Sequence, residues 1–434
     1  MNKKNNKLLP ELRFPEFVEN SGNRGNPKNQ GSDNGEWEEK TLGEVGDFIG
    51  GGTPDTTNEE YWNGDILWFT PTEVKEGNLT NSKRKITEKG LQSSSAKILP
   101  IGALLITTRA TIGDIGIATS PCTTNQGFQS LVVNDDQVNL FWYYWIAFNK
   151  NELIKRSSGS TFPEIGKNEI IQITALVPSI KEQKKIASCL SSLDEVITAQ
   201  SQKLELLKDH KKGLMQNLFP TQGEKTPKLR FKEFKEEWVE KALGEVANVS
   251  KLAGYEFTKH IVYENKGNII ALRGLNIKNN KLELSDVKYI DNSELSKLSR
   301  SKLFIDDLMF TYIGTIGEVA LIDENNKYYL APNVSRIRAD KSKVNPQFLL
   351  QYFNVPDFKE KEIAKYISSS SQPALTMENV RKFSIHLPTL PEQQKIASCL
   401  SALDELIKSQ TEKIEQLKLH KKGLMQGLFP KMND

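Results

Sequence analysis

The sequence has few of the residues that build disulfide frameworks or metal centres. Its 434 residues include only three cysteines and four histidines. The cysteines, Cys122, Cys189 and Cys399, are too few and too scattered for a disulfide framework or a Cys-x-x-Cys zinc site, and the histidines have no metal-ligand spacing. We therefore expect a protein without a structural metal.

Long apolar runs and a strong charge of either sign are also absent. No window approaches the roughly eighteen apolar residues that span a bilayer, and the N-terminus "MNKKNNKLLPELRF" lacks the apolar core of a secretion signal. We expect a cytoplasmic protein with no membrane contact. The formal net charge is only +3, so any contact with nucleic acid must come from local basic patches.

What the sequence does contain is a long internal repeat. Residues 178–220 align without gaps onto residues 388–430, and 29 of the 43 positions are identical. Two shorter matches precede this one: "PELRFPEF" and "EWEEKTLGEV" near the N-terminus match "PKLRFKEF" and "EWVEKALGEV" from Pro227. A Gly-, Asn- and Ser-rich insert at about residues 18–35 interrupts the first copy and is typical of a flexible linker.

Between the repeated flanks lie two blocks that have diverged. They resemble each other only in "TTRATIGDIGIA" beside "FTYIGTIGEVAL", and in "SSGSTFPEI" beside "SSSSQPALT". The chain therefore divides into an entry segment at 1–45, a first module at 46–177, a repeated helix at 178–220, a linker and second entry at 221–246, a second module at 247–387, and a second repeated helix at 388–434. Two modules of one architecture that read different things fit this order.

The near-identical segments predict two long helices, the first from Lys181 to Gln216. Apolar residues recur at alternating intervals of four and three, which is typical of a coiled-coil seam. Because both copies carry the same seam, we predict that the helices pair as antiparallel rods; packing of each helix on its own module is the alternative. The seam residues are Leu190, Leu193, Ile197, Leu204 and Leu207, and Leu400, Leu403, Ile407, Ile414 and Leu417.

The helices end in the repeated string "HKKGLMQxLFP". Pro220 and Pro430 stop them, since proline lacks the next amide donor and clashes with the preceding turn. The lysines of the string therefore lie in the last helical turns. There they complement the helix dipole or face a partner or a phosphate.

Each module shows a strand-and-turn pattern. Short β-branched or aromatic runs such as "GDILWFT", "ALLITTR" and "NIIALRG" are bounded by Gly, Asn and Asp, and helical stretches follow near Asn139 and Pro346. We therefore predict an α+β protein with two globular α/β modules and twisted sheets. The two helices, as an antiparallel coiled coil, would separate the modules, and the repeat would give the chain a pseudo-twofold symmetry.

Basic residues cluster in the predicted turns of both modules. Arginine and lysine beside Ser, Thr and Asn suit contact with phosphates and with base edges in a major groove. Ordinary surfaces also carry scattered cations, so a solvated surface is the alternative. The residues are Lys83, Arg84 and Lys85 in the first module and Arg273, Lys278 and Arg300 in the second.

Two short segments match sequence motifs of enzymes. "FIGGG" from Phe48 fits the F-x-G-x-G of S-adenosylmethionine-dependent methyltransferases, but no helix is expected to follow it and the chain has no Pro-Pro dipeptide, so we interpret it as a glycine-rich turn. Asp55, Glu73 and Lys75 fit the loose PD…ExK pattern of magnesium-dependent nucleases. The second module has no counterpart, which argues against this pattern. A self-contained nuclease that uses these three residues is our alternative hypothesis.

The order of motifs resembles the specificity subunit of type I restriction-modification systems over essentially the whole chain. It runs "LRF…EW…LGEV", a variable block, "EQxKIA…LSxLDE", a heptad helix and "HKKGLMQxLFP", and then repeats. The resemblance implies a subunit that has no catalytic activity and binds no cofactor directly. It also implies two target-recognition domains, each reading one half of a bipartite site in double-stranded DNA.

The same resemblance implies partners. Two methylation subunits, bringing S-adenosylmethionine, would dock on the repeated regions and the adjacent recognition domains. Two restriction subunits would join them for ATP-dependent translocation and cleavage, with Mg²⁺ as a further cofactor of the partners. A two-module protein-interaction scaffold that does not bind DNA is the remaining alternative.

We predict base contacts at polar residues in motifs that the modules share and in the turns beside them. The alternative for each is that its side chain stabilises a turn. The residues are Thr53, Arg109, Thr111, Ser158, Ser160 and Thr161 in the first module, and Tyr312, Thr315, Ser369, Ser370 and Gln372 in the second.

Overall fold

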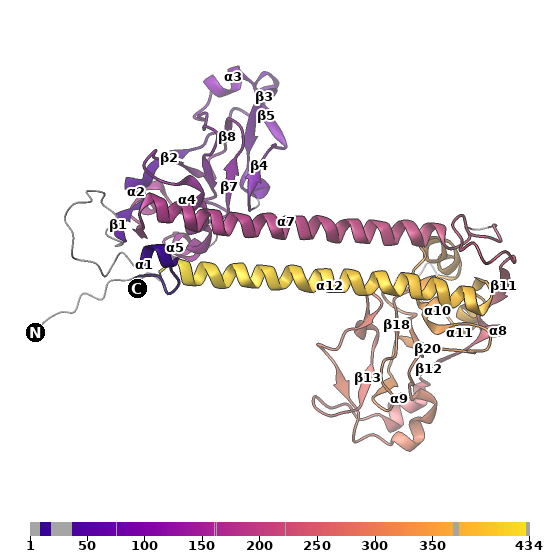
Figure 1. Ribbon diagram of the computed structural model, residues 1–434. Helices are drawn as coiled ribbons and strands as arrows, with labels where there is room; N and C mark the ends of the chain where they lie inside the picture. The colour runs from indigo at the N-terminus through magenta and orange to yellow at the C-terminus, as the bar shows by residue number, and fades with distance from the viewer. Residues whose placement is uncertain are drawn as a thin grey trace, which may run out of the picture. The chain divides into compact units, whose positions relative to one another are not determined.

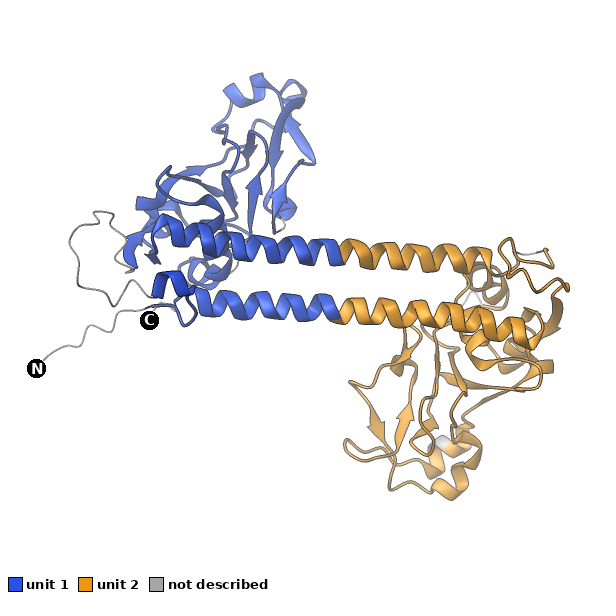
Figure 2. Cartoon of the chain, in the orientation of Figure 1, with its two compact units in different colours: residues 1–200, 413–434 blue, residues 201–412 orange. Residues whose placement is uncertain are grey.

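The chain forms two compact units (Figure 2). Unit 1 comprises residues 1–200 with 413–434, and unit 2 comprises residues 201–412. The structure, a computed structural model, describes residues 9–18, 37–74, 76–159, 161, 163–221, 223–367 and 373–430. Residues 19–35 of the predicted insert, Lys75, Ser160, Ser369, Ser370 and Gln372 lie outside the described residues.

The first module, in unit 1, is built on two sheets (Figure 1). The larger sheet has the strand order β2-β9-β6-β7-β4 and the smaller sheet the order β5-β3-β8. In the smaller sheet, β3 runs parallel to β8 and antiparallel to β5. The strands are β2 (Gly46–Gly50), β3 (Trp62–Phe69), β4 (Asn78–Leu79), β5 (Arg84–Ile86), β6 (Leu104–Ile106), β7 (Ile115–Ala118), β8 (Cys122–Thr124) and β9 (Gln129–Val133).

Alternation along β6 shows how the larger sheet uses both faces. Leu104 and Ile106 join a core with the helices, whereas Leu105 joins the core between the two sheets. Trp142 and Trp145 of α4 (Asn139–Phe148), which covers this sheet, are 0% and 2% exposed and belong to the core. The helices of this module are α3 (Glu88–Gln92), α4 (Asn139–Phe148), α5 (Lys150–Lys155) and α6 (Lys167–Ile171).

The second module, in unit 2, repeats this topology. Its four-stranded sheet has the order β12-β20-β17-β18, its three-stranded sheet the order β16-β13-β19, and β14 pairs with β15. β13 runs parallel to β19 and antiparallel to β16, as in the first module. The strands are β12 (Ala247–Lys251), β13 (Ile270–Leu272), β14 (Ile277–Lys278), β15 (Lys281–Leu282), β16 (Lys288–Tyr289), β17 (Leu308–Thr311), β18 (Val319–Leu321), β19 (Tyr328–Leu330) and β20 (Val334–Ala339).

The helical stretch predicted from Pro346 is divided in the structure. Pro356 follows α10 and, lacking an amide hydrogen, cannot continue its hydrogen-bond ladder. A π-helical turn at Phe358–Ile363 and a short 3-10 turn at Ala364–Tyr366 come next. The α-helices of this module are α9 (Gly254–His260), α10 (Pro346–Tyr352) and α11 (Met377–Arg381).

A two-stranded antiparallel ribbon closes each module and explains the repeated "EW" and "LGEV" motifs. β1 (Glu38–Thr41) pairs with β10 (Thr174–Val177), and β11 (Val239–Ala242) pairs with β21 (Ser384–Leu387). The "LGEV" turns are the helices α2 (Leu42–Val45) and α8 (Leu243–Val246), whose first leucines are 1% and 0% exposed. Each ribbon leads directly into a long helix.

The two long helices are α7 (Ile180–Asn217) and α12 (Leu390–Leu428). With a rise of about 1.5 Å per residue, α7 is about 57 Å long. Of the predicted seam residues, Leu190, Leu400 and Ile414 are buried and the others are partly buried. Among the described residues, no helix is both long and apolar enough to cross a membrane.

Parts of both helices lie side by side within each unit, and they run antiparallel (Figures 1 and 2). In unit 1, Asp194 near the start of α7 lies 2.6 Å from the ammonium group of Lys421 near the end of α12. In unit 2, Lys211 near the end of α7 lies 2.6 Å from Asp404 near the start of α12. The same charge pair therefore occurs once in each unit.

The last turn of each helix is buried in the core of a module. Phe429, beyond the end of α12, is fully buried in unit 1, and its ring lies 5.6 Å from those of Phe141 and Phe148. Phe219, beyond the end of α7, is 2% exposed in unit 2 and packs against Phe348. The "LFP" of the repeated string is therefore a core anchor.

Phe429→Ala should loosen unit 1 and leave unit 2 intact. Removal of a fully buried phenylalanine costs about 3–5 kcal/mol through lost contacts and the cavity left behind. Hydrogen exchange followed by mass spectrometry should show lower protection in β6 and β9 and unchanged protection in β17 and β20. Phe219→Ala is the matched variant with the opposite pattern; equal loosening of both units by either variant would contradict this assignment.

Candidate nucleic-acid interface

The first motif that the modules share folds into a closed loop after β6. The amide of Thr107 donates to the carbonyl of Asp114 (2.9 Å), and the amide of Gly113 donates to the carbonyl of Thr107 (2.9 Å). The hydroxyl of Thr107 donates to the carbonyl of Thr111 (2.5 Å). Ala110 takes a left-handed backbone conformation, with φ of 59°, so the loop turns sharply there.

The second module forms the same loop after β17. Thr311 donates its amide to Glu318 (3.0 Å), accepts from the amide of Gly317 (3.1 Å), and donates its hydroxyl to the carbonyl of Thr315 (2.5 Å). Gly314 holds the left-handed position, with φ of 80°. The sequence similarity of this motif therefore reflects one hydrogen-bond pattern, which leaves the loop's outer side chains free to differ.

The second shared motif lies directly against this loop in the first module. Ser158 and Glu164 exchange two backbone hydrogen bonds of 2.9 Å, and the amide of Ile165 donates to the carbonyl of Thr108 (3.2 Å). Arg109 also forms an ion pair with Glu164, with 2.8 Å between Nε and Oε1. The two motifs, about fifty residues apart in the chain, thus form one surface.

The second module joins the same two segments. The amide of Leu375 donates to the carbonyl of Tyr312 (2.9 Å), as Ile165 does to Thr108 in the first module. Ile313 and Ala374 form an isolated β-bridge, in the place of Arg109 and Glu164. A charged pair in one module is therefore an apolar pair in the other, on the same backbone.

The ends of two parallel strands complete this surface. β3 and β8 end at the same edge, where the amide of Asn125 donates to the carbonyl of Phe69 (3.0 Å). The carbonyl of Gly127 accepts the amide of Thr108 (2.8 Å), which joins this edge to the loop. In the second module, Asn333 takes the place of Gly127 and accepts the amide of Tyr312 (3.3 Å).

In the second module this edge encloses a hollow of about 800 Å³. Three predicted contact residues, Arg273, Lys278 and Thr315, line it together, although they are up to 42 positions apart in the sequence. Lys288 adds a third cation and Glu318 an anion. The full lining is Tyr263, Arg273, Gly274, Leu275, Ile277, Lys278, Asn279, Lys288, Thr311, Ile313, Thr315, Glu318, Pro332 and Asn333.

The cations of the hollow are held differently. Arg273 donates from Nη2 to the carbonyl and the carboxylate of Asp286, at 2.9 and 3.0 Å, while its buried Nε has no hydrogen-bond partner among the described residues. Lys288 donates to Asn265 (2.6 Å). Lys278 is exposed. Burial raises the pKa of the Tyr263 phenol, so this group stays a hydrogen-bond donor at neutral pH.

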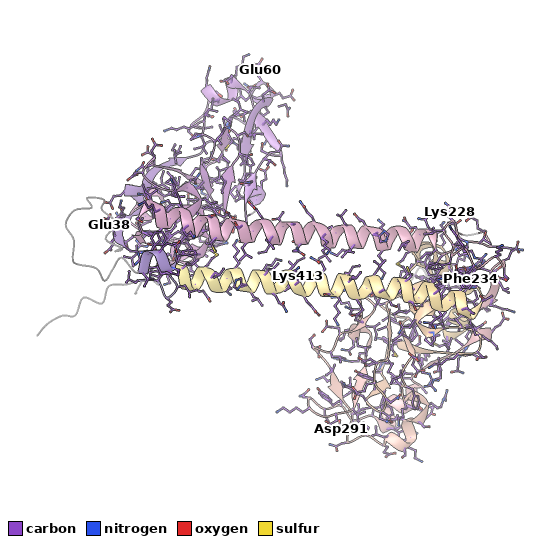
Figure 3. All side chains as sticks on the ribbon, viewed as in Figure 1. Glu38, Glu60, Lys228, Phe234, Asp291 and Lys413 are labelled. Atoms are coloured by element: carbon purple, nitrogen blue, oxygen red, sulfur yellow. The ribbon has the colours of Figure 1, made fainter. Side chains whose placement is uncertain are left out.

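Several predicted contact residues of the first module lie along the corresponding edge. Thr53 donates its hydroxyl to Gln126 (2.6 Å), beside the turn that ends β8. Lys83 and Arg84 are exposed at the start of β5, and Lys85 is partly buried. Figure 3 labels Glu60, in the short turn before β3, at the end of unit 1 that lies away from α7.

Other predicted contact residues lie elsewhere or are less accessible. Tyr312 is 7% exposed and the ammonium of Lys251 lies 5.4 Å from its ring, so its side chain supports the loop from beneath. Arg300 is exposed but is not among the residues that line the hollow. Thr111 is partly buried and Thr161 is exposed.

Sequence reasoning missed the residues that hold each long helix to its module. Arg13 forms a bidentate ion pair with Glu182 at the start of α7, at 2.8 and 2.7 Å. Arg230 binds Glu392 at the start of α12 in the same way, at 2.7 and 2.8 Å. These glutamates look like capping-box residues in the sequence, but their carboxylates bind the arginines of the repeated "LRF" motif.

The neighbouring glutamine of each helix also has a repeated role. Gln183 accepts the amide of Val138 at the start of α4 (2.9 Å), and Gln393 accepts the amide of Asn345 at the start of α10 (2.8 Å). Both glutamines are 1% exposed. The repeated "EQ" dipeptide therefore fixes the angle between each long helix and the helix that covers its module.

The repeated "HKK" string has an internal role as well. Its first lysines, Lys211 and Lys421, form the ion pairs with Asp404 and Asp194. The two aspartates also accept from Gln351 (3.0 Å) and Tyr144 (2.7 Å) of the covering helices. The second lysines of the string are exposed.

The carboxylates of the nuclease hypothesis act as local caps. Asp55 accepts from the amide and hydroxyl of Thr57, which lowers its pKa. Glu73 accepts from Thr70 and from the amide of Lys83. In the part of the chain that the structure describes, no three His, Cys, Asp or Glu side chains gather as a metal site would require.

Residues 34–209 and 215–419 match the family model of the type I restriction modification DNA specificity domain. The chain belongs to this family. A specificity subunit is the non-catalytic component of its system, and membership of this family gives the nuclease hypothesis no support. The double match also accounts for the internal repeat and for the shared topology of the two modules.

Individual relatives agree over most of their length. The specificity subunit of the MjaIX type I restriction enzyme from Methanocaldococcus jannaschii is 30% identical over 92% of each chain. The EcoprrI specificity subunit from Escherichia coli is 23% identical over 86% of this chain and 88% of its own. The crystal structure of the S subunit from M. genitalium superposes with a TM-score of 0.57 over 98% of this specificity subunit and all of that chain, at 15% identity, and shows the shared fold.

Thr311→Val should loosen the loop after β17 without unfolding the second module. The substitution removes the hydroxyl that binds the carbonyl of Thr315 and leaves that buried region with an unsatisfied acceptor, at a cost of about 1–3 kcal/mol. Hydrogen exchange should rise at the amide of Gly317. Thr107→Val is the matched variant for the first module; unchanged exchange in both loops would contradict the role assigned to these hydroxyls.

Proposed function

We propose that each module reads one half of a bipartite, asymmetric site in double-stranded DNA. The observation that carries this proposal is that one backbone edge recurs in both modules with different outward side chains. Arg109 and Glu164 in one module correspond to Ile313 and Ala374 in the other. Two surfaces of equal shape and different chemistry suit two half-sites of different sequence.

The residues of this edge would divide the work of binding. Exposed lysines such as Lys83 and Lys278 would neutralise phosphates, which positions the protein without reading sequence. Thr53, Arg109, Thr111 and Ser158 in the first module would approach base edges. Arg273 and Thr315 would do so in the second module, from the walls of the hollow. Thr161 and Arg300 would contact the DNA backbone beside these positions.

The paired helices would act as the ruler between the half-sites. A helix of about 57 Å matches at most about 17 base pairs at 3.4 Å each. Two half-sites separated by about one helical turn, and thus on one face of the duplex, fall within this limit. The seam from Leu190 to Leu207 and from Leu400 to Leu417 would keep the ruler straight.

The partners would join on the repeated parts of the chain. We infer two methylation subunits, because the repeated entry segments and long helices occur twice in the chain and offer two equivalent surfaces. Two restriction subunits would complete the complex. S-adenosylmethionine, Mg²⁺ and ATP would belong to these partners, and the complex would act on chromosomal DNA in the cytoplasm.

Exchange of residues 46–177 for the corresponding module of a relative should change one half of the recognised sequence and leave the other half unchanged. The reason is that each module carries a complete edge of its own. Sequencing of methylated sites in cells that express the chimera with its methylation subunit measures this. A change in both halves, or in neither, would refute the modular proposal.

Removal of one heptad from both helices should shorten the spacer and leave the half-sites unchanged. Deletion of residues 199–205 together with 410–416 keeps Asp194 facing Lys421 and Lys211 facing Asp404. Seven residues correspond to about 10 Å, or about three base pairs. Sequencing of methylated sites should show the same bases with a shorter spacer between the half-sites. An unchanged spacer would mean that the helices do not set the spacing. The control is a deletion from one helix alone, which breaks the register between the helices.

A further inference from the structure

One arginine of the first module is held on an aromatic platform. The guanidinium carbon of Arg84 lies 3.4 Å from the centre of the Trp62 ring and 5.7 Å from that of Trp68. A separation of 3.4 Å is van der Waals contact, so the guanidinium rests against the face of the Trp62 ring. Contact of this kind adds cation–π attraction and restricts the orientation of the planar group.

The platform itself is rigid. Trp62 and Trp68 are 6% and 4% exposed and meet edge to face at 5.0 Å. Each indole nitrogen donates to a backbone carbonyl, Trp62 to Asp55 (3.0 Å) and Trp68 to Gly52 (2.9 Å). An arginine on such a support loses less conformational freedom on binding than an arginine on an open surface.

Arg84 differs from three other arginines of the modules, which bind carboxylates. Arg109, Arg273 and Arg338 each form an ion pair with a carboxylate. Arg84 is exposed. Among the described residues, no carboxylate lies within ion-pair distance of its guanidinium. Its outer N–H groups are therefore available to an acceptor from outside the chain.

The position of Arg84 is continuous with the proposed DNA-reading edge. Arg84 pairs with Trp68, one residue before the end of β3. The indole nitrogen of Trp68 binds the carbonyl of Gly52, and Thr53 is the next residue in the chain. Thr53 in turn contacts Gln126 in the turn that ends β8. Arg84 therefore extends the edge formed by the parallel strand ends.

We propose that Arg84 reads a guanine in the half-site of the first module. A guanidinium whose face is covered presents its edge, and two parallel N–H donors on that edge match O6 and N7 of guanine in the major groove. The exposed Lys83 beside it suits a phosphate, whereas a planar guanidinium of fixed orientation suits a base. This inference rests on the proposal that the first module reads DNA.

The second module has a different arrangement at this place. Lys288 pairs with Ala271 in the corresponding pair of strands, and its ammonium binds Asn265. Neither a tryptophan platform nor a planar fork is present at that register. The guanine assigned to Arg84 should therefore belong to one half-site alone.

The test is base preference measured with the full chain and its methylation subunit on a randomised DNA library. Arg84→Lys keeps the charge and removes the fork, so discrimination at one guanine should fall by roughly 5- to 150-fold. All other positions, including the whole second half-site, should keep their preferences. Trp62→Leu removes the platform but keeps Arg84 and should relax the same position; Arg84→Lys alone decides if Trp62→Leu fails to fold.

Lys83→Gln is the matched control for charge. Loss of a phosphate contact should weaken binding to all sequences equally and lower the salt dependence by about one ion, without a change in base preference. The proposal is overturned if Arg84→Gln behaves in this uniform way, which would make Arg84 a phosphate contact, or if Arg84→Lys changes nothing. Failure of the module exchange to alter a half-site would refute the proposed function itself. The Arg84 variants test only the guanine contact, so the two proposals can fail separately.

Discussion

A buried pair of opposite charges fixes the start of each long helix, and the arrangement of each unit depends on it. The side chains of Arg13 and Glu182 are 8% and 2% exposed, and those of Arg230 and Glu392 are 15% and 0% exposed. Loss of one partner would leave an uncompensated buried charge, at a cost of about 3–5 kcal/mol. With the helix start fixed, the adjacent glutamine orients the covering helix, and the aspartate further along meets its lysine.

The chain separates the residues that hold its framework from those that face outward. In the loops after β6 and β17, the framework bonds are backbone amides and carbonyls together with one threonine hydroxyl, and only the threonine requires a particular side chain. The outward positions can therefore change without loss of the loop. This explains why the repeated helices stay nearly identical while the modules diverge: a heptad seam and a buried ion pair depend on side chains, and a β-framework depends mainly on its backbone.

Local patterns in the sequence predicted the helices and strands, but they could not predict contacts between residues far apart in the chain. Heptad spacing gave α7 to within one residue at each end, because that spacing is a property of the helix itself. The strands around Trp68, Leu105 and Ile270 also followed from β-branched runs and turn residues. The pairing of Arg13 with Glu182, 169 positions apart, leaves no local signal, and Glu182 imitated a capping residue.

The candidate interface was predictable only in part for the same reason. The shared motifs indicated that the two modules form the same loops. Nothing in the sequence showed that Thr315, Lys278 and Arg273 border one hollow, because parallel strands bring distant turns to one edge. Tyr312 was selected by its position in the motif, yet it lies beneath the loop at 7% exposure. The platform under Arg84 depends on the register between β3 and β5, which composition does not specify.

The anchoring of Phe429 in unit 1 has a consequence for how the chain is made. Unit 2 is a single continuous stretch, residues 201–412, whereas unit 1 needs residues 413–434 as well as residues 1–200. A ribosome synthesises the chain from its N-terminus, and domains fold as their residues emerge. Unit 1, whose synthesis begins first, is therefore completed last. A chain that ends before the last turn of α12 contains a complete unit 2 but an incomplete unit 1.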